Sequence, residues 1–149
     1  MNMTILREEN VVLNQTFNNK EEAIRKAGQL LVDGGYVQPE YIESMLEREN
    51  TVSTFMGNFI AIPHGKEDAK QLIDNTGISV VQVPNGINFG GEGEDKLAMI
   101  LIGIAGAGDD HLEVLSQIAI YCSEIENVTK LADAKSEKEI VQLLGGIEG

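Results

Sequence analysis

The sequence LAMILIGI at residues 97–104 contains no polar residue. A strand with one face in water alternates apolar and polar side chains, whereas a strand covered on both faces can be apolar throughout. We therefore expect residues 97–104 to form a central strand of a sheet, with other elements packed on both of its faces.

Three further apolar segments predict the strands that accompany it. Residues 78–83 are rich in β-branched side chains, and residues 59–62 lead into Pro63, which favours extended backbone at the residue before it. We expect the second of these strands to end at His64. A shorter apolar segment lies at residues 11–13.

Helices are predicted between these strands because apolar residues recur there at helical spacing. Capping-box spacing occurs three times, and it marks the starts of the first, third and last helices. The pairs are Asn19 with Glu22, Asp110 with Glu113, and Ser136 with Glu139. The predicted helices run from Asn19 to Gly34, over 40–49, from Asp109 through Cys122, over 124–132, and from Ser136 to Gly145.

Alternating strands and helices favour an α/β fold, here a single β-sheet of about five strands, mixed or largely parallel, flanked by helices on both faces. No internal repeat, low-complexity tract or Pro- and Ser-rich linker interrupts the 149 residues. We therefore expect one domain that spans residues 1–149.

The composition excludes several classes of partner. The chain carries 11 Lys and Arg against 24 Asp and Glu, a net charge of -13, whereas nucleic-acid phosphates are held mainly by Lys and Arg. We expect no nucleic-acid partner, and a protein partner with a basic face.

The single cysteine, Cys122, excludes an internal disulfide, and no secretory leader pattern is present. The longest apolar run, 97–107, is too short to span a membrane. We expect a cytoplasmic protein without direct membrane insertion.

The chain has two histidines, His64 at the end of a predicted strand and His111 in the first turn of a predicted helix. Side chains at such positions tend to be presented rather than buried. A neutral imidazole can act as a nucleophile, and Pro63 and Gly65 would hold the backbone around His64 while admitting another molecule. Local features alone also allow His64 to fill a turn and His111 to be an ordinary polar residue on a helix surface.

Arg48 lies in the last turn of the helix predicted at 40–49, where a cation also interacts favourably with the helix dipole. A phosphoryl group on His64 would need a planar cation and a second hydrogen-bond donor, and Arg48 and His111 supply these types. Positioning and charge stabilisation do most of the work in phosphoryl transfer. Together the three residues are consistent with a phosphoryl-transfer site.

The segment ENTVSTFMGNFIAIPHG at 49–65 resembles the phosphorylation-site signature of the mannitol/fructose-type enzyme IIA of the bacterial sugar phosphotransferase system. The flanking segments, LLVDGGYVQPEYIESMLERE at 30–49 and LIGIAGAGDDHLEVLSQIA at 101–119, resemble the mannitol branch in particular. The chain is identified as a member of this family, and the resemblance covers nearly its whole length. The fold it implies is a mixed sheet flanked by helices.

The resemblance also implies a function. His64 would accept a phosphoryl group on Nε2 from the phosphohistidine of the carrier protein HPr and pass it to a cysteine of the cognate enzyme IIB. His111 and Arg48 match the second histidine and the arginine of the family's active site. The chain would then be a phosphotransferase with a covalent phosphohistidine intermediate, supporting uptake and phosphorylation of mannitol. No cofactor and no metal are expected, and enzyme IIB and the membrane component are expected on separate chains.

The sequence departs from the family pattern at Lys66, where the motif usually continues with Thr, and at Ala107, where a basic residue is common. We expect Lys66 to face solvent rather than the phosphoryl group. We also expect Asp109 and Asp110 to cap their helix or to face a basic partner.

Other functions are considered beside this one. The same fold would suit a fructose or other polyol enzyme IIA, or a regulatory enzyme IIA-like protein that modulates other proteins. A metal-binding module is disfavoured because the sequence has no cluster of residues at metal-ligand spacing. A glycine-rich loop lacks the Gly-Lys-Ser/Thr ending of a nucleotide-binding loop, so nucleotide binding is not expected; its glycines are Gly86, Gly90, Gly91 and Gly93.

Overall fold

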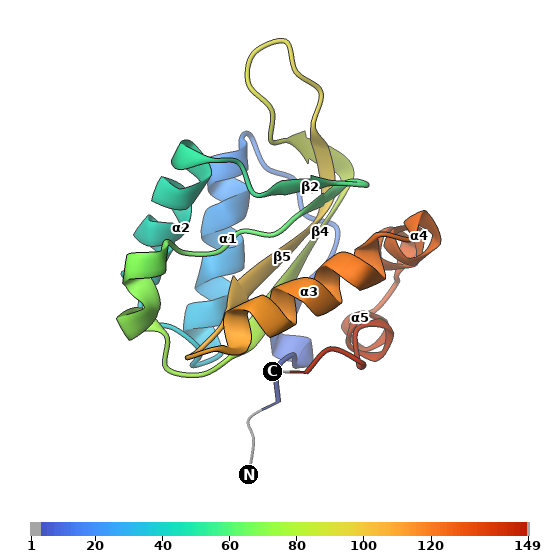
Figure 1. Ribbon diagram of the computed structural model, residues 1–149. Helices are drawn as coiled ribbons and strands as arrows, with labels where there is room; N and C mark the ends of the chain where they lie inside the picture. Colours follow the sequence, from blue (N-terminus) through green and yellow to red (C-terminus); the bar gives the residue numbers. More distant parts are fainter. Residues whose placement is uncertain (1–3, 149) are drawn as a thin grey trace.

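The computed structural model describes residues 4–148. Residues 1–3 and 149, which belong to the domain expected over 1–149, lie outside the described part. Residues 1–3 are also the start of the N-terminal segment in which no secretory leader pattern was found. Strand β5 (Leu97–Ala105) lies in the middle of a five-stranded mixed sheet of order β1-β4-β5-β3-β2 (Figure 1). The prediction of a central strand at 97–104 is confirmed. The other strands are β1 (Val11–Val12), β2 (Phe55–Gly57), β3 (Ile60–Ala61) and β4 (Gly77–Asn88).

The pairing makes the sheet mixed, as predicted. Strand β4 runs antiparallel to β5 on one side, and β3 runs parallel to β5 on the other. Strand β1 is parallel to β4, and the edge strand β2 is antiparallel to β3. Two parallel strands, β3 and β5, therefore lie side by side and end at the same edge of the sheet.

Helices cover both faces of the sheet, which explains why β5 is apolar throughout. One face carries Ile100, Ile102 and Ile104, which pack with α3 (Asp110–Cys122), α4 (Ile125–Asp133) and α5 (Glu137–Leu143). The other carries Leu101 and Ala105, which pack with α1 (Lys20–Asp33) and α2 (Tyr41–Thr51). All five side chains are fully buried. Among the described residues, no helix has both the length and the apolar character needed to cross a membrane.

Two of the three predicted helix caps form. The Asn19 side chain accepts a hydrogen bond from the Glu22 amide at 2.9 Å, and the Ser136 hydroxyl accepts one from the Glu139 amide at 3.1 Å. The predicted cap at Asp110 is wrong, because Asp109 holds the N-cap position and makes no side-chain cap bond. Asp110 instead accepts a hydrogen bond from the hydroxyl of Thr76 at 2.6 Å, so a tertiary partner replaces the local one.

Strand β4 is longer than the predicted 78–83. Its pairing with β5 shifts register between Gln82 and Ile87, and Pro84 lies inside this irregularity. A bulge accommodates a residue without an N–H, which allows the strand to resume beyond the proline and to include Gly86, predicted to lie in a loop. The connection to β5 projects beyond the sheet, and its residues 91–95 are exposed (Figure 1).

Strand β2 and the two short 3-10 helices, η1 (Glu8–Asn10) and η2 (Glu67–Leu72), were not expected from the pattern. Each is only a few residues long, with no full period of apolar side chains to mark it. The short helix η2 matters most, because it follows directly after the segment that carries His64.

The role of β5 can be tested by shortening one inward side chain. Leu101→Ala removes a fully buried side chain from the middle of the sheet, and we expect it to lower the free energy of unfolding by about 2 to 5 kcal/mol. Leu97→Ala, on the same strand at a side chain that is 40% exposed, should cost less than about 1 kcal/mol. Urea denaturation followed by circular dichroism measures both, and equal losses would contradict the assignment.

Candidate functional site

The two histidines meet at the carboxyl ends of two adjacent parallel strands. His64 follows β3 and forms an isolated parallel bridge with Ile104 of β5, while His111 lies in the first turn of α3, directly after β5. Their ring centroids are 5.0 Å apart, with the ring planes inclined at 50°. This edge of a sheet is where α/β proteins commonly bind ligands. The structure thus brings together two residues that are distant in sequence.

His111 depends on a glycine for its position. A Cβ atom on Gly106 would lie 2.3 Å from the Cα of His111 and 2.6 Å from its amide nitrogen. Real Cβ atoms do not approach backbone so closely, so any other residue at 106 would push the start of α3 away from the end of β5. Gly106 therefore sets how closely His111 approaches His64.

The orientation of the His64 ring is set by one backbone carbonyl. Nδ1 of His64 lies 2.7 Å from the carbonyl oxygen of Ile62. A carbonyl oxygen only accepts hydrogen bonds, so Nδ1 must carry the proton and donate it. In a neutral ring this leaves Nε2 with a free lone pair. The site therefore holds an imidazole in the tautomer that can attack through Nε2.

His64 is buried, with 8% of its surface exposed, which corrects the expectation that it is presented to solvent. The prediction treated the strand end as the edge of the molecule. In the structure, the backbone beyond His64 turns back onto α2, where Tyr41 and Ser44 bind it, and the ring of His111 lies beside that of His64.

Helix α2 holds the backbone that follows His64. The hydroxyl of Tyr41 accepts a hydrogen bond from the Gly65 amide at 2.8 Å and donates one to the Ile104 carbonyl at 2.9 Å. One turn further along, the hydroxyl of Ser44 accepts from the Lys66 amide at 2.8 Å. Burial raises the pKa of Tyr41 to about 12, so its hydroxyl stays protonated. A Cβ on Gly65 would lie 2.5 Å from the Tyr41 ring, so the close packing of this backbone against Tyr41 also requires glycine at position 65.

The electrostatics of the site keep both imidazoles neutral. Burial is the largest cause that lowers the pKa of His64; the Ile62 carbonyl opposes it, the neighbouring His111 and Arg48 lower it further, and the Glu49 carboxylate raises it. Burial also lowers the pKa of His111; the charges of Lys70 and Arg48 add to the effect, and the charge of Glu67 opposes it. Since an ordinary histidine titrates near 6.5, both rings are mainly uncharged at neutral pH.

Arg48 lies in the last turn of α2, as predicted, and its guanidinium donates to the carbonyl of Val52 just beyond the helix. Its positive charge lowers the pKa of both His64 and His111. Arg48 is therefore close enough to both imidazoles to interact with them electrostatically. Across residues 4–148, no group of three or more His, Cys, Asp and Glu side chains is arranged to hold a metal ion.

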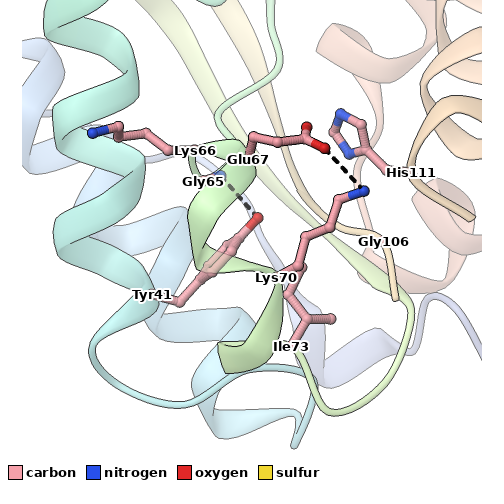
Figure 2. A pocket seen from close by; sticks show the side chains of 8 residues that line it. All are labelled: Tyr41, Gly65, Lys66, Glu67, Lys70, Ile73, Gly106 and His111. Carbon is pink, nitrogen blue, oxygen red and sulfur yellow. Dashed lines mark hydrogen bonds and ion pairs between the residues drawn. The ribbon is translucent and has the colours of Figure 1, made fainter. Parts of the chain in front are cut away.

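A small pocket beside His111 contains residues that the sequence analysis did not single out. Figure 2 shows the side chains of Glu67 and Lys70, both from η2, ending next to the His111 ring, where they form an ion pair at 3.3 Å. Lys66 extends in the opposite direction and pairs with the exposed side chain of Glu47 at 3.4 Å. The missed residues lie on an element too short to show a sequence period.

Helical spacing could have revealed two other missed residues. Tyr41, Ser44 and Arg48 are three and four positions apart, which places them on one face of a helix. Polar and aromatic side chains on the helix face that also carries Arg48 indicate that this face binds the backbone next to His64.

Fold and site together define an α/β protein that holds a neutral, oriented histidine at the end of a parallel strand.

Comparison with known proteins assigns the family. A model described as phosphoenolpyruvate-dependent sugar phosphotransferase system, EIIA 2, matches residues 4–146. The chain is 57% identical over 134 residues to the mannitol-specific phosphotransferase enzyme IIA component of Enterococcus faecalis, which covers 90% of this chain and 92% of that protein. The chain therefore belongs to the EIIA 2 family of the sugar phosphotransferase system, as the resemblance at 49–65 predicted.

Solved structures of enzyme IIA proteins have the same fold as this chain. The crystal structure of IIA mannitol from Escherichia coli superposes with a TM-score of 0.86 at 41% identity, over 93% of this chain and 98% of that chain. A complex of enzyme IIAMTL and phosphorylated enzyme IIBMTL from the same organism gives a TM-score of 0.88 at 40% identity, over 95% and 97% of the two chains. The predicted fold class is confirmed.

The electrostatic role of Arg48 makes a prediction. Removing its positive charge in Arg48→Ala relieves repulsion of the protonated rings, so the pKa values of His64 and His111 should both rise towards 6.5. Arg25→Ala, which removes an exposed arginine paired with Glu43, should change neither. NMR titration of the imidazole C–H protons measures these values. Unchanged histidine pKa values in Arg48→Ala would refute the assignment.

Proposed function

We propose that this chain, as a single enzyme IIA domain over residues 1–149, carries a phosphoryl group on Nε2 of His64. The donor is the phosphohistidine of HPr, and the acceptor is a cysteine of an enzyme IIB on a separate chain. The observation that carries the proposal is the 2.7 Å hydrogen bond from Nδ1 of His64 to the Ile62 carbonyl, which leaves Nε2 free. Family membership supplies the reaction class.

The transfer needs little acid–base chemistry at His64. The Nε2 lone pair forms a bond to phosphorus while the bond to the HPr nitrogen breaks, and the departing nitrogen keeps that electron pair. The ring becomes a phosphorylated imidazolium, whose Nδ1–H remains bonded to the Ile62 carbonyl. In the second step the cysteine thiolate of enzyme IIB attacks phosphorus, and Nε2 recovers its lone pair. Positioning and charge stabilisation are then the main demands on the protein.

Arg48 and His111 are proposed to meet those demands by contacting the phosphoryl oxygens. Support comes from the 5.0 Å separation of the two rings and from the influence of the Arg48 charge on both. A guanidinium is planar and suited to phosphate, and an imidazole N–H adds a second donor. The neutral ring of His111 can donate from one nitrogen without repelling the phosphohistidine.

Mannitol is the proposed sugar, supported by the name of the relative from Enterococcus faecalis and by that of the Escherichia coli structure. The separate enzyme IIB is supported by the solved complex with a phosphorylated IIB. We further propose a cytoplasmic location, which agrees with membership of a sugar phosphotransferase family and with a single, buried cysteine.

Single-turnover kinetics with phosphorylated HPr test the three roles. His64→Ala should abolish labelling because the nucleophile is lost. His111→Ala should still accept the phosphoryl group but transfer it slowly, and Arg48→Ala should slow both steps, since each removes a phosphate contact. Intact mass and acid lability report the phosphohistidine. Full activity of His64→Ala would overturn the proposal.

The choice of sugar is tested with the acceptor. Phosphorylated protein should transfer faster to a mannitol enzyme IIB than to a fructose enzyme IIB at equal concentrations. Faster transfer to the fructose protein would favour the fructose alternative. Labelling by HPr without transfer to any enzyme IIB would favour the regulatory one.

A further inference from the structure

A buried carboxylate lies directly after Arg48 on α2, and the proposed transfer steps leave it without a role. The side chain of Glu49 is only 2% exposed, although it lies in the last turn of a surface helix. Charged groups are rarely buried unless they are paired and hydrogen-bonded. The partners of Glu49 should therefore show what this side chain does.

The main partner is Thr54, in the connection that leads to β2. One carboxylate oxygen of Glu49 accepts hydrogen bonds from the Thr54 amide at 2.8 Å and from its hydroxyl at 2.7 Å. The other oxygen accepts from the ammonium of Lys20 at 3.0 Å, and Lys20 also donates to the Phe89 carbonyl at 3.2 Å. Hydrogen bonds to a charged acceptor are stronger than neutral ones. Glu49 thus pins Thr54 from both its backbone and its side chain.

Thr54 in turn holds Ile62. The Thr54 carbonyl accepts a hydrogen bond from the Ile62 amide at 3.0 Å. The carbonyl of that same Ile62 accepts the Nδ1–H of His64 at 2.7 Å. A continuous chain of hydrogen-bonded residues therefore runs from Glu49 through Thr54 and Ile62 to the ring of His64.

The carboxylate is charged in this setting. Burial raises the pKa of Glu49, but hydrogen bonds from Ser53, Thr54 and Lys20 together outweigh burial and leave its pKa below the usual value. Lys20 compensates the charge, which makes its burial tolerable.

We propose that Glu49 is a positioning residue that selects the Nδ1–H tautomer of His64 by holding Thr54, and through it the Ile62 carbonyl. If Thr54 shifts, the Ile62 carbonyl no longer faces Nδ1 and the ring can carry its proton on Nε2. That proton would occupy the atom that attacks phosphorus. The inference rests on the proposed role of His64 as nucleophile, but the tautomer is a property of the unphosphorylated protein and is measured without any transfer.

Nitrogen-15 NMR of the imidazole rings at pH 7.5 distinguishes the two tautomers directly. Wild type should show one state of His64, with the proton on Nδ1. In Glu49→Ala, we expect a detectable Nε2–H population and a rate of phosphorylation by phospho-HPr that is about ten- to hundredfold lower. Glu49→Gln keeps an acceptor oxygen for Thr54, so it should retain the wild-type tautomer and recover most of the rate.

Two further variants complete the test. Glu43→Ala, an exposed glutamate on the same helix, is the matched control and should change neither tautomer nor rate. Thr54→Val removes the hydroxyl donor but keeps the branched shape, and it should also produce a detectable Nε2–H population. Circular dichroism establishes that each variant is folded. If Glu49→Ala does not fold, Thr54→Val decides the question.

A wild-type tautomer in every folded variant of Glu49 and Thr54 would overturn the inference, even where the phosphorylation rate falls, because the loss would then be structural. Equal damage in Glu49→Gln and Glu49→Ala would also overturn it, since charge rather than hydrogen bonding would be responsible. Failure of the proposed function has a different signature: wild-type protein would not be phosphorylated at all, whatever its tautomer.

Discussion

The hydrogen bond from Nδ1 of His64 to the Ile62 carbonyl is the interaction on which the rest of the site depends. It fixes which of the two ring nitrogens carries the proton, so that Nδ1 is the donor and Nε2 keeps a free lone pair. The bond is local, spanning two residues, but the geometry that keeps it is not. Pro63 has no backbone N–H to donate, but its carbonyl accepts a hydrogen bond from the Ile104 amide at 2.9 Å, which ties this turn to the central strand.

Helix α2 is the element that makes this local geometry rigid. Tyr41 and Ser44 bind the amides of Gly65 and Lys66, on one side of the histidine, while Glu49 acts on the other side through Thr54. A single helix therefore holds the histidine segment both before and after His64. The energetic cost of burying an imidazole is offset by these bonds, and burial itself keeps the ring neutral.

Much of the fold and the family could be predicted from the sequence, because the patterns that indicate them are periodic or chemically specific. The unbroken apolar run at 97–104 predicted the centre of the sheet, and the stretch at 49–65 predicted the family. Burial of His64 was not predictable, because it depends on segments that are distant in sequence: the backbone beyond the histidine returns to α2, and His111 lies beside the ring. The cap at Asp110 failed for a related reason: its partner, Thr76, is distant in sequence. Glu49 was visible as the first residue of the signature, but its contacts with Lys20 and Thr54 appear only in three dimensions.

The projecting connection between β4 and β5 is a suitable place to attach a probe. Its exposed residues 91–95 lie at the start of β5, whereas His111 follows the end of that strand. Strand β5, which lies between them, is nine residues of extended chain and spans about 30 Å. Exposed loop tips with small residues are the places where chains tolerate insertion best. A fluorophore or affinity sequence placed between Gly91 and Asp95 would follow partner exchange from the far end of the sheet, leaving the histidine edge free for both partners to approach.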